Sequence, residues 1–445
     1  MELDAAVQNT VKKLEGEDVD MFEVFGMSKS SLSIEAKRQM IHMYRRSTSR
    51  GIAVRVVADG RIGWSATTDI SAKEVAKTVS HAIASLKVSS SSDEAVIVKP
   101  QEPEGGFYER VGRSYSEISD DEKMQMALKL ESEAIASDKR LARVRSPIYE
   151  EETVQFSIVN SNGVFLNAKR GLVSAMLLAI ATEEGVSESE FDFVFTPRFE
   201  DLDVQSIARN AAERAVAKLG ATSMEGGQYP VIFENRAASS MLKILSPSFF
   251  ADNVQRSKSR LAGQVGEEVY SPLVTIIDDG LLPDGFGSFA FDGEGVPSQR
   301  NILVSSGKIN SFLYDGPRAN KDGVPSTGNC MRADVNDIPS IGVTNFFLKA
   351  GTTKAGDLMS DVSKGLFVTN LLGIHTANPI SGDFSFGAEG FLIKDGRKDR
   401  PVRGVTIAGN THDLFKDIVA VADDLTFRSQ CGSPSFRVDG LMVAS

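Results

Sequence analysis

The sequence predicts an α+β protein in which two helix–sheet–helix modules precede a larger C-terminal domain rich in antiparallel β-strands. Two observations carry this prediction. The order helix, several strands, helix occurs twice in the first half of the chain. Later, short strand-like segments follow one another with glycine turns and few helices between them, which favours antiparallel pairing. We therefore expect an N-terminal module at residues 1–98, a middle module at 99–222 and the C-terminal domain at 223–445.

The first module opens with a helical pattern. Ala6, Val7, Val11 and Leu14 recur near the 3.6-residue period of a helix, and Gly16 ends the run. Four segments with alternating or apolar residues then predict strands at 20–25, 32–35, 41–46 and 52–57. The dipeptide at 59–60, Asp-Gly, indicates a hairpin, and a second amphipathic helix begins after residue 71.

A polar segment rich in Ser, Pro, Glu and Gly, residues 89–106, predicts a linker before the middle module. The same order of elements then returns: a helix at 120–137, strands at 140–146, 152–160 and 164–182, and a helix at 204–219. The pattern suggests a distant internal duplication. The C-terminal domain opens with a strand at 229–234 and an apolar helix at 237–245.

Composition excludes several classes of protein. The 445 residues carry a net charge of −11, which disfavours nucleic-acid binding. No apolar segment approaches the roughly 20 residues that a membrane helix needs, and the acidic N-terminus lacks the pattern of a signal peptide. The two cysteines, Cys330 and Cys431, are too few for a disulfide framework. We therefore expect a cytoplasmic protein that binds neither membrane nor nucleic acid.

Motifs for metal or nucleophilic chemistry are missing from the sequence. None of the four histidines is spaced as in His-Glu-x-x-His, and there is no Cys-x-x-Cys or Gly-x-Ser-x-Gly. A site built from His375, His412 and Cys431 stays open in principle, but such remote ligands have no diagnostic spacing. Asp292 and Glu294 could be paired catalytic carboxylates, although acidic residues in an Asp-Gly-x-Gly segment are more often turn residues.

One segment, residues 373–388, is crowded with small, hydroxyl and glycine residues and leads into a strand at 390–394. Such a segment can present backbone donors and acceptors to an extended peptide, or it can be a tightly wound loop. Composition alone does not choose between these interpretations. The candidate residues are His375, Ser381, Gly382, Asp383, Ser385 and Gly387.

Five motifs in the C-terminal domain give the chain a resemblance to the TldD/PmbA family, also called modulators of DNA gyrase. They lie at 291–297 (Phe-Asp-Gly-Glu-Gly-Val-Pro), 326–329 (Ser-Thr-Gly-Asn), 381–385 (Ser-Gly-Asp-Phe-Ser), 405–410 (Val-Thr-Ile-Ala-Gly-Asn) and 430–434 (Gln-Cys-Gly-Ser-Pro). In the TldD branch, the helix after the first strand of this domain carries His-Glu-x-x-x-His. In this chain the corresponding positions are occupied, in an approximate register, by Lys243, Ile244 and Ser248, which cannot bind zinc.

The resemblance therefore points to the TldE/PmbA branch, which lacks the zinc motif. It implies a metal-less subunit that pairs with a TldD-like catalytic subunit, or self-associates, in the processing of small unfolded peptides. By this resemblance, the chain itself is expected to hold no catalytic residue, metal or cofactor, and zinc is expected in the partner. The resemblance also adds Cys431 to the candidate peptide-binding residues. The alternatives are a stand-alone peptide-binding or regulatory protein without peptidase activity and, less favoured, a hydrolase with a hidden site.

Overall fold

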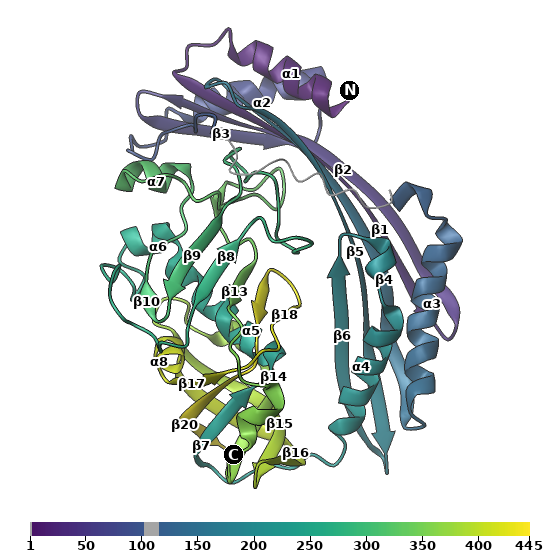
Figure 1. Ribbon diagram of the computed structural model, residues 1–445. Helices are drawn as coiled ribbons and strands as arrows, with labels where there is room; N and C mark the ends of the chain where they lie inside the picture. Colours follow the sequence, from purple (N-terminus) through teal and green to yellow (C-terminus); the bar gives the residue numbers. More distant parts are fainter. Residues whose placement is uncertain (1, 102–114) are drawn as a thin grey trace.

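The computed structural model describes residues 2–101 and 115–445. Both N-terminal modules contribute to one antiparallel sheet of six strands, which curves around the C-terminal domain (Figure 1). Along this sheet the strands are β3 (Arg61–Thr67), β2 (Met40–Ala58), β1 (Met21–Lys37), β4 (Leu141–Asn160), β5 (Phe165–Glu183) and β6 (Val186–Thr196). The long pairing of β1 with β4 joins the modules, so their strands are ordered symmetrically about this pair.

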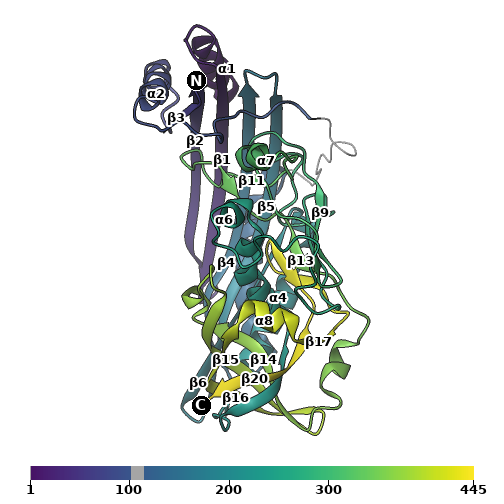
Figure 2. The ribbon, with the colours of Figure 1, turned by 90° about the vertical axis from the view of Figure 1, so that its left-hand side faces the viewer.

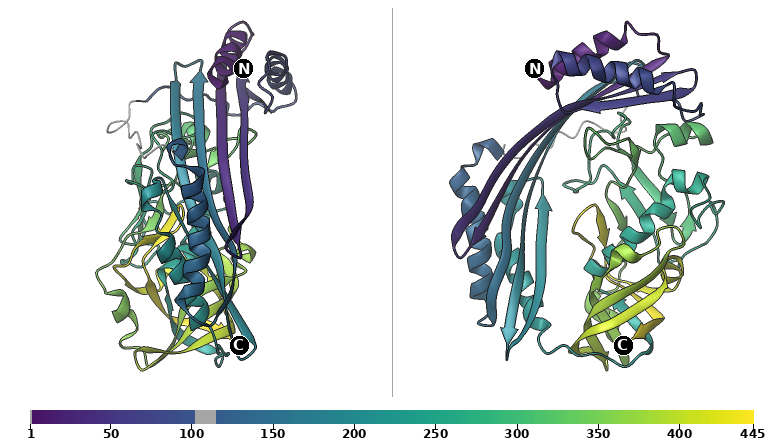
Figure 3. Two further views of the ribbon diagram at one scale, coloured as in Figure 1. Left: turned by 90° about the vertical axis from the view of Figure 1, so that its right-hand side faces the viewer. Right: turned by 180° about the vertical axis from the view of Figure 1, so that it is seen from behind.

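The helices of the two modules cover the outer face of the curved sheet, and the C-terminal domain lies against its inner face (Figures 1 and 3). They are α1 (Leu3–Leu14), α2 (Ala72–Ser85), α3 (Asp120–Ser137) and α4 (Val204–Ala217). Successive residues of β1 point alternately to the outer and the inner face of the sheet. Gly26 faces α1, where an added Cβ would lie 2.5 Å from the Val7 side chain. Phe25 and Met27 instead pack with Phe291 of the C-terminal domain.

The expected helices of the two modules are confirmed, but the N-terminal strands are longer than the sequence patterns predicted. β2 continues without a break from Met40 to Ala58, whereas two short strands were expected there. The reason is that residues 44–50 are all exposed, so no buried face imposes an alternating pattern on them. The α+β class, with its β-rich C-terminal domain, is confirmed.

The C-terminal domain contains two six-stranded sheets, and β16 of the second also pairs with β20, so that sheet curls back on itself. The first sheet consists of β10 (Lys308–Ile309), β9 (Arg300–Ser305), β8 (Ile276–Asp279), β13 (Phe346–Leu348), β19 (Cys431–Ser433) and β18 (Thr426–Phe427). The second consists of β16 (Arg397–Asn410), β15 (Asp383–Lys394), β14 (Lys364–Leu372), β7 (Gly227–Phe233), β20 (Phe436–Ala444) and β17 (Ile418–Val421).

The helix α5 (Asn235–Leu245) packs against strands of both sheets, and its apolar residues lie in the largest buried core of the molecule. Shorter elements surround this core: α6 (Ala251–Gln255), α7 (Gly316–Asp322), α8 (Thr411–Lys416) and the strand pair β11 (Cys330–Met331) and β12 (Ser340–Ile341). Figure 2 shows how the strands of the curved sheet run alongside this domain. Within the described part of the chain, no helix is long and apolar enough to cross a membrane.

Candidate functional site

The segment singled out in the sequence is partly strand. β15 begins at Asp383, so Ser385 and Gly387 are strand residues paired with Ala408 and Thr406 of β16. The short 3-10 turn η5 (Ile374–Thr376) holds His375, which is exposed. The structure thus brings Ser381, Gly382 and Asp383 together at the start of β15 and leaves His375 in a separate turn.

A hydrogen-bond network fixes the tight turn before β15. The Asp383 carboxylate accepts hydrogen bonds from the Ser381 hydroxyl (2.7 Å) and the Asn410 side-chain amide (2.8 Å). The bonds from Asn410 and Ser381 lower the pKa of Asp383, so this exposed carboxylate is ionised at neutral pH. An open groove of about 520 Å³ lies here between this turn and residues 257–260.

The backbone conformation at residue 382 favours glycine. Its φ is +81°, and an added Cβ would lie 2.7 Å from the Thr411 hydroxyl. The Gly382 carbonyl accepts hydrogen bonds from the Thr411 amide (2.8 Å) and the Thr411 hydroxyl (3.0 Å). A larger residue at this position would therefore strain the turn and separate it from the start of α8.

His412 and Cys431 do not share a site. The His412 side chain is buried, with Nδ1 2.9 Å from the Tyr270 hydroxyl and Nε2 3.3 Å from the Ser248 hydroxyl. Burial, together with Arg260, lowers the pKa of His412 to about 4, so the ring is neutral. Cys431 lies instead on β19, which packs against α5.

Cys431 is a buried thiol with a lysine nearby. Burial raises its pKa to about 12, against the opposing effect of the Lys243 charge. The thiol is therefore protonated at neutral pH and is a weak nucleophile and metal ligand. The facing helix, α5, has the sequence Asn-Arg-Ala-Ala-Ser-Ser-Met-Leu-Lys-Ile-Leu and offers no imidazole, thiolate or carboxylate.

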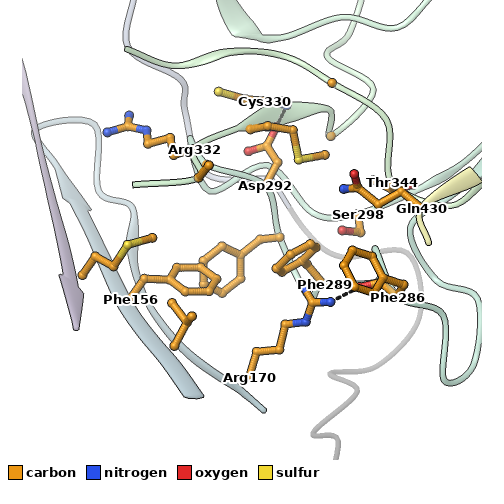
Figure 4. Close-up of a pocket in the computed structure, with 18 of the residues that line it drawn as sticks. Phe156, Arg170, Phe286, Phe289, Asp292, Ser298, Cys330, Arg332, Thr344 and Gln430 are labelled. Atoms are coloured by element: carbon orange, nitrogen blue, oxygen red, sulfur yellow. Dashed lines mark hydrogen bonds between the residues drawn. The ribbon is translucent and has the colours of Figure 1, made fainter. Parts of the chain in front are cut away.

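A cavity of about 500 Å³ lies between the inner face of the curved sheet and loops of the C-terminal domain (Figure 4). Side chains from β1, β4 and β5 form one wall, and residues of the segments 286–298, 328–333 and 342–344 form the other. Five of the residues that line it are phenylalanines: Phe25, Phe156, Phe286, Phe289 and Phe291. Phe156 meets Phe291 edge to face, with ring centroids 5.4 Å apart, which is a favourable aromatic geometry.

Asp292, which lines this cavity, and Glu294, two positions further on, both have structural partners. The Asp292 carboxylate accepts hydrogen bonds from the backbone amides of Glu294, Val296 and Cys330, so it holds the turn that the sequence favoured. Burial and the neighbouring Glu294 charge raise the pKa of Asp292. Glu294 itself pairs with Arg55 of β2 at 2.8 Å.

Sequence reasoning missed the cavity because its walls come from distant segments. Phe156 and Arg170 lie more than one hundred positions before Phe289 and Ser298, and no local spacing connects them. The only local signal was the alternation Phe25–Met27 and Val154–Phe156, which marks an apolar inner face without showing what it meets.

Comparison with known proteins defines the class of this chain. Sequence models of PmbA/TldA metallopeptidases match in three consecutive parts: domain 1 at residues 22–86, the central domain at 113–219 and the C-terminal domain at 226–445. The chain belongs to the PmbA/TldA metallopeptidase family.

Individual relatives cover nearly the whole chain. The metalloprotease PmbA of Escherichia coli O157:H7 is 25% identical over 98% of this chain and 96% of its own length. The crystal structure of a Thermotoga maritima protein described as a modulator of DNA gyrase is 27% identical, covers both chains completely and has a TM-score of 0.90. TldE from Thermococcus kodakarensis, 24% identical, covers 99% of this chain and 100% of its own and shares the fold with a TM-score of 0.87.

Family membership implies a metal, but the residues beside Cys431 do not fit one. Zinc is held by Cys, His, Asp or Glu, and a catalytic site needs three such ligands. α5 supplies none of them, and the nearby cation Lys243 opposes a bound dication. Among residues 2–101 and 115–445, no group of three His, Cys, Asp or Glu side chains is placed to hold a metal ion.

Proposed function

We propose that this chain is the TldE/PmbA-type, non-catalytic subunit of a metallopeptidase that processes small unfolded peptides. A TldD-like subunit would supply the zinc ion and the general base. One observation carries the proposal: in a chain of metallopeptidase family, the helix opposite Cys431 carries a lysine and no metal-binding side chain. The name of the Escherichia coli relative, metalloprotease PmbA, supports the peptidase context.

The role of this chain would be to bind peptide and shape the chamber in which the partner cleaves it. The candidate peptide contacts lie at the turn and the start of β15, with the exposed His375 before them: Ser381, Gly382, Asp383, Ser385, Gly387 and His375. Cys431, the remaining candidate, is buried on β19 and would act through the packing of the chamber wall rather than by touching the peptide. We place the complex in the cytoplasm, because both cysteines are free thiols, as in a reducing compartment.

Co-expression with a TldD-like protein from the same genome tests the assignment. We expect the two chains to co-purify, the pair to cleave an unstructured reporter peptide, and the zinc to amount to about one ion per pair. Replacing the motif glutamate of the partner by glutamine should abolish cleavage without separating the chains. Stoichiometric zinc or peptide cleavage in the isolated chain would contradict the proposal.

The same experiment addresses the alternative of a stand-alone protein. A chain that binds peptide but never associates with a TldD-like subunit would favour the peptide-binding or regulatory function. Failure of both association and peptide binding would reject both assignments.

The turn before β15 needs a variant that spares the fold. Gly382→Val would strain the backbone at φ +81°, so a loss of activity there would report folding as much as peptide binding. Ser385 is exposed on β15 and accepts a larger side chain more easily. We expect Ser385→Trp to reduce cleavage by the pair about tenfold while assembly is kept, because bulk there blocks an extended peptide. Full cleavage by this variant would remove the turn from the mechanism.

A further inference from the structure

The cavity between the curved sheet and the C-terminal domain opens to solvent beside the exposed Ala333 and reaches inward to the buried Ser298. Parts of a protein that pack together normally leave little such space, because interiors are packed like organic crystals. A volume of about 500 Å³ lies in the range of ligand-binding pockets. Its wall is mostly apolar and aromatic. Water can form few hydrogen bonds there, whereas transfer of an apolar group from water into the cavity is favourable in free energy.

The charged side chains on the wall are already engaged by the protein. Lys29 of β1 pairs with Glu152 of the neighbouring strand β4, and Arg332 pairs with the buried Glu23. Arg170 donates to the Phe286 carbonyl and lies over the rings of Phe286 and Phe289, 5.2 and 4.5 Å from their centroids (Figure 4). Since all three cations have partners and the two arginines also lie over ring faces, the wall favours an uncharged ligand.

Two polar atoms on the wall make no hydrogen bond among the residues that the structure describes: Ser298 Oγ and Arg332 Nε. Arg332 is already paired with Glu23, so of the two side chains only the buried Ser298 has no partner at all. The other polar side chains at this end are satisfied: Gln430 donates to the Val343 carbonyl at 3.2 Å and Thr344 to Asp278 at 2.8 Å. A buried hydroxyl without a partner costs free energy, which a ligand with one polar atom would recover.

We propose that this cavity binds an aromatic side chain of a peptide, with Ser298 meeting a polar atom of the same residue. The peptide nature of the ligand rests on the proposed function; the aromatic, uncharged character rests on the wall alone. Edge-to-face contacts with Phe156, Phe289 and Phe291 would surround the ring. The chain would thereby select peptides with phenylalanine or tyrosine at one position.

Calorimetric titration of the isolated full-length chain tests this directly. The probes are the neutral peptides acetyl-Gly-Gly-Phe-Gly-Gly-amide and its counterpart with alanine in place of phenylalanine. We expect the phenylalanine peptide to bind at least about tenfold more tightly, as burial of an aromatic side chain implies. Equal affinity for the two peptides would overturn the proposal.

Variants then locate the binding. Ala333 is exposed and lines the cavity, so Ala333→Trp should fill the opening without disturbing the core and weaken the phenylalanine peptide about tenfold. Ala5→Trp, on the exposed side of α1, is the matched control and should bind like the original chain. Ser298→Ala should weaken the same peptide about threefold. Unchanged affinity in Ala333→Trp would show that the peptide binds elsewhere.

A peptide with a free carboxylate tests whether the cavity also favours a negative charge, separately from its preference for an aromatic ring. The same phenylalanine peptide with an acid C-terminus should bind no more tightly than the amide, because the wall cations are paired. A gain of about tenfold or more would overturn the assignment of an uncharged ligand. These titrations use no partner subunit. Their outcome is therefore independent of the co-purification and cleavage experiments, and either proposal can be contradicted without the other.

Discussion

Two groups of ion pairs join the curved sheet to the C-terminal domain, and they differ in how far they are removed from water. In the first, which we call the inner cluster, Glu23, Arg55, Glu294 and Arg332 are all nearly inaccessible to solvent. In the second, the β6 row, the acids Glu188, Glu190 and Asp192 are buried but meet cations that are partly exposed.

The inner cluster is balanced, with two guanidinium groups against two carboxylates. Arg55 lies 2.9 Å from Glu23 and 2.8 Å from Glu294, and so connects β1 and β2 to the C-terminal domain. Burial alone would raise the pKa of Glu23, but the charges of Arg332 and Arg55 outweigh it and lower the pKa. The carboxylate is therefore ionised at neutral pH, and the two arginines are what offset the effect of its burial.

The cations of the β6 row are Lys218 directly after α4, Arg236 of α5, Arg403 of β16 and Arg428 directly after β18. Glu190 lies 3.4 Å from both Lys218 and Arg236, and Asp192 pairs with Arg428. Except for the buried Arg236, these cations keep contact with water, and the side chain of Arg403 is 49% exposed. Similar ion pairs are therefore expected to differ in energy: loss of one partner should cost more in the inner cluster, where water cannot replace it, than in the β6 row.

The largest effect should follow from removing one partner of the inner cluster. Arg55→Met leaves Glu23 and Glu294 buried without their shared cation, which should cost about 3–5 kcal/mol of stability. Thermal and urea unfolding followed by circular dichroism measure it. Arg46→Met, at a pair with Asp120 in which both side chains are exposed, is the control and should change stability by less than about 1 kcal/mol. An equal, small effect of both variants would show that burial does not separate the two kinds of pair.

A smaller effect is expected in the β6 row. Asp192→Asn removes the charge that meets Arg428, and because water reaches the arginine, we expect a loss of about 1–3 kcal/mol. Within the same row, Arg403→Met should cost about 0.5 kcal/mol, since its side chain is half exposed. A loss for Asp192→Asn as large as that for Arg55→Met would remove the distinction between the two groups.

Asp315, a carboxylate beside the inner cluster, should also make stability depend on pH. Asp315 caps α7 close to Glu294, and burial together with the Glu294 charge raises its pKa to about 6. The unfolded value is about 3.9, so the folded protein holds this proton more tightly. The stabilisation is therefore complete below about pH 4 and is lost as pH rises towards 6.

Asp315→Asn keeps the helix cap but removes the titration. The stability of the original chain relative to this variant should fall by about 2 kcal/mol between pH 4 and pH 6, measured by unfolding at each pH. Asp203→Asn, the same exchange at the exposed cap of α4, is the control. A difference that stays constant over this pH range, or that grows as pH rises, would contradict the prediction.

The sequence was informative where function and structure are local. The amphipathic helices, the turn that Asp292 holds and the helix without zinc ligands were all found from neighbouring residues, because helix periodicity and turn chemistry act over a few positions. Glu23 meets Arg332 across 309 positions, and no spacing rule connects such residues. The inner cluster and the aromatic cavity therefore required the three-dimensional structure. The domain boundaries at 98/99 and 222/223 and the peptide-binding residues of the segment 373–388 stay predictions.

The smallest effect is expected at Cys431, which belongs to neither group of ion pairs. In this chain the thiol is buried and its raised pKa, about 12, keeps it protonated, so it can act neither as a nucleophile nor as a ready metal ligand. Cys431→Ser should leave peptide cleavage by the complex within about threefold, because only packing around β19 changes. Cys431→Ala controls for the cost of burying a hydroxyl, and circular dichroism confirms the fold. Complete loss of cleavage in both variants, with fold and assembly intact, would assign this thiol a direct part in the chemistry and would require a revised account of the α5–β19 region.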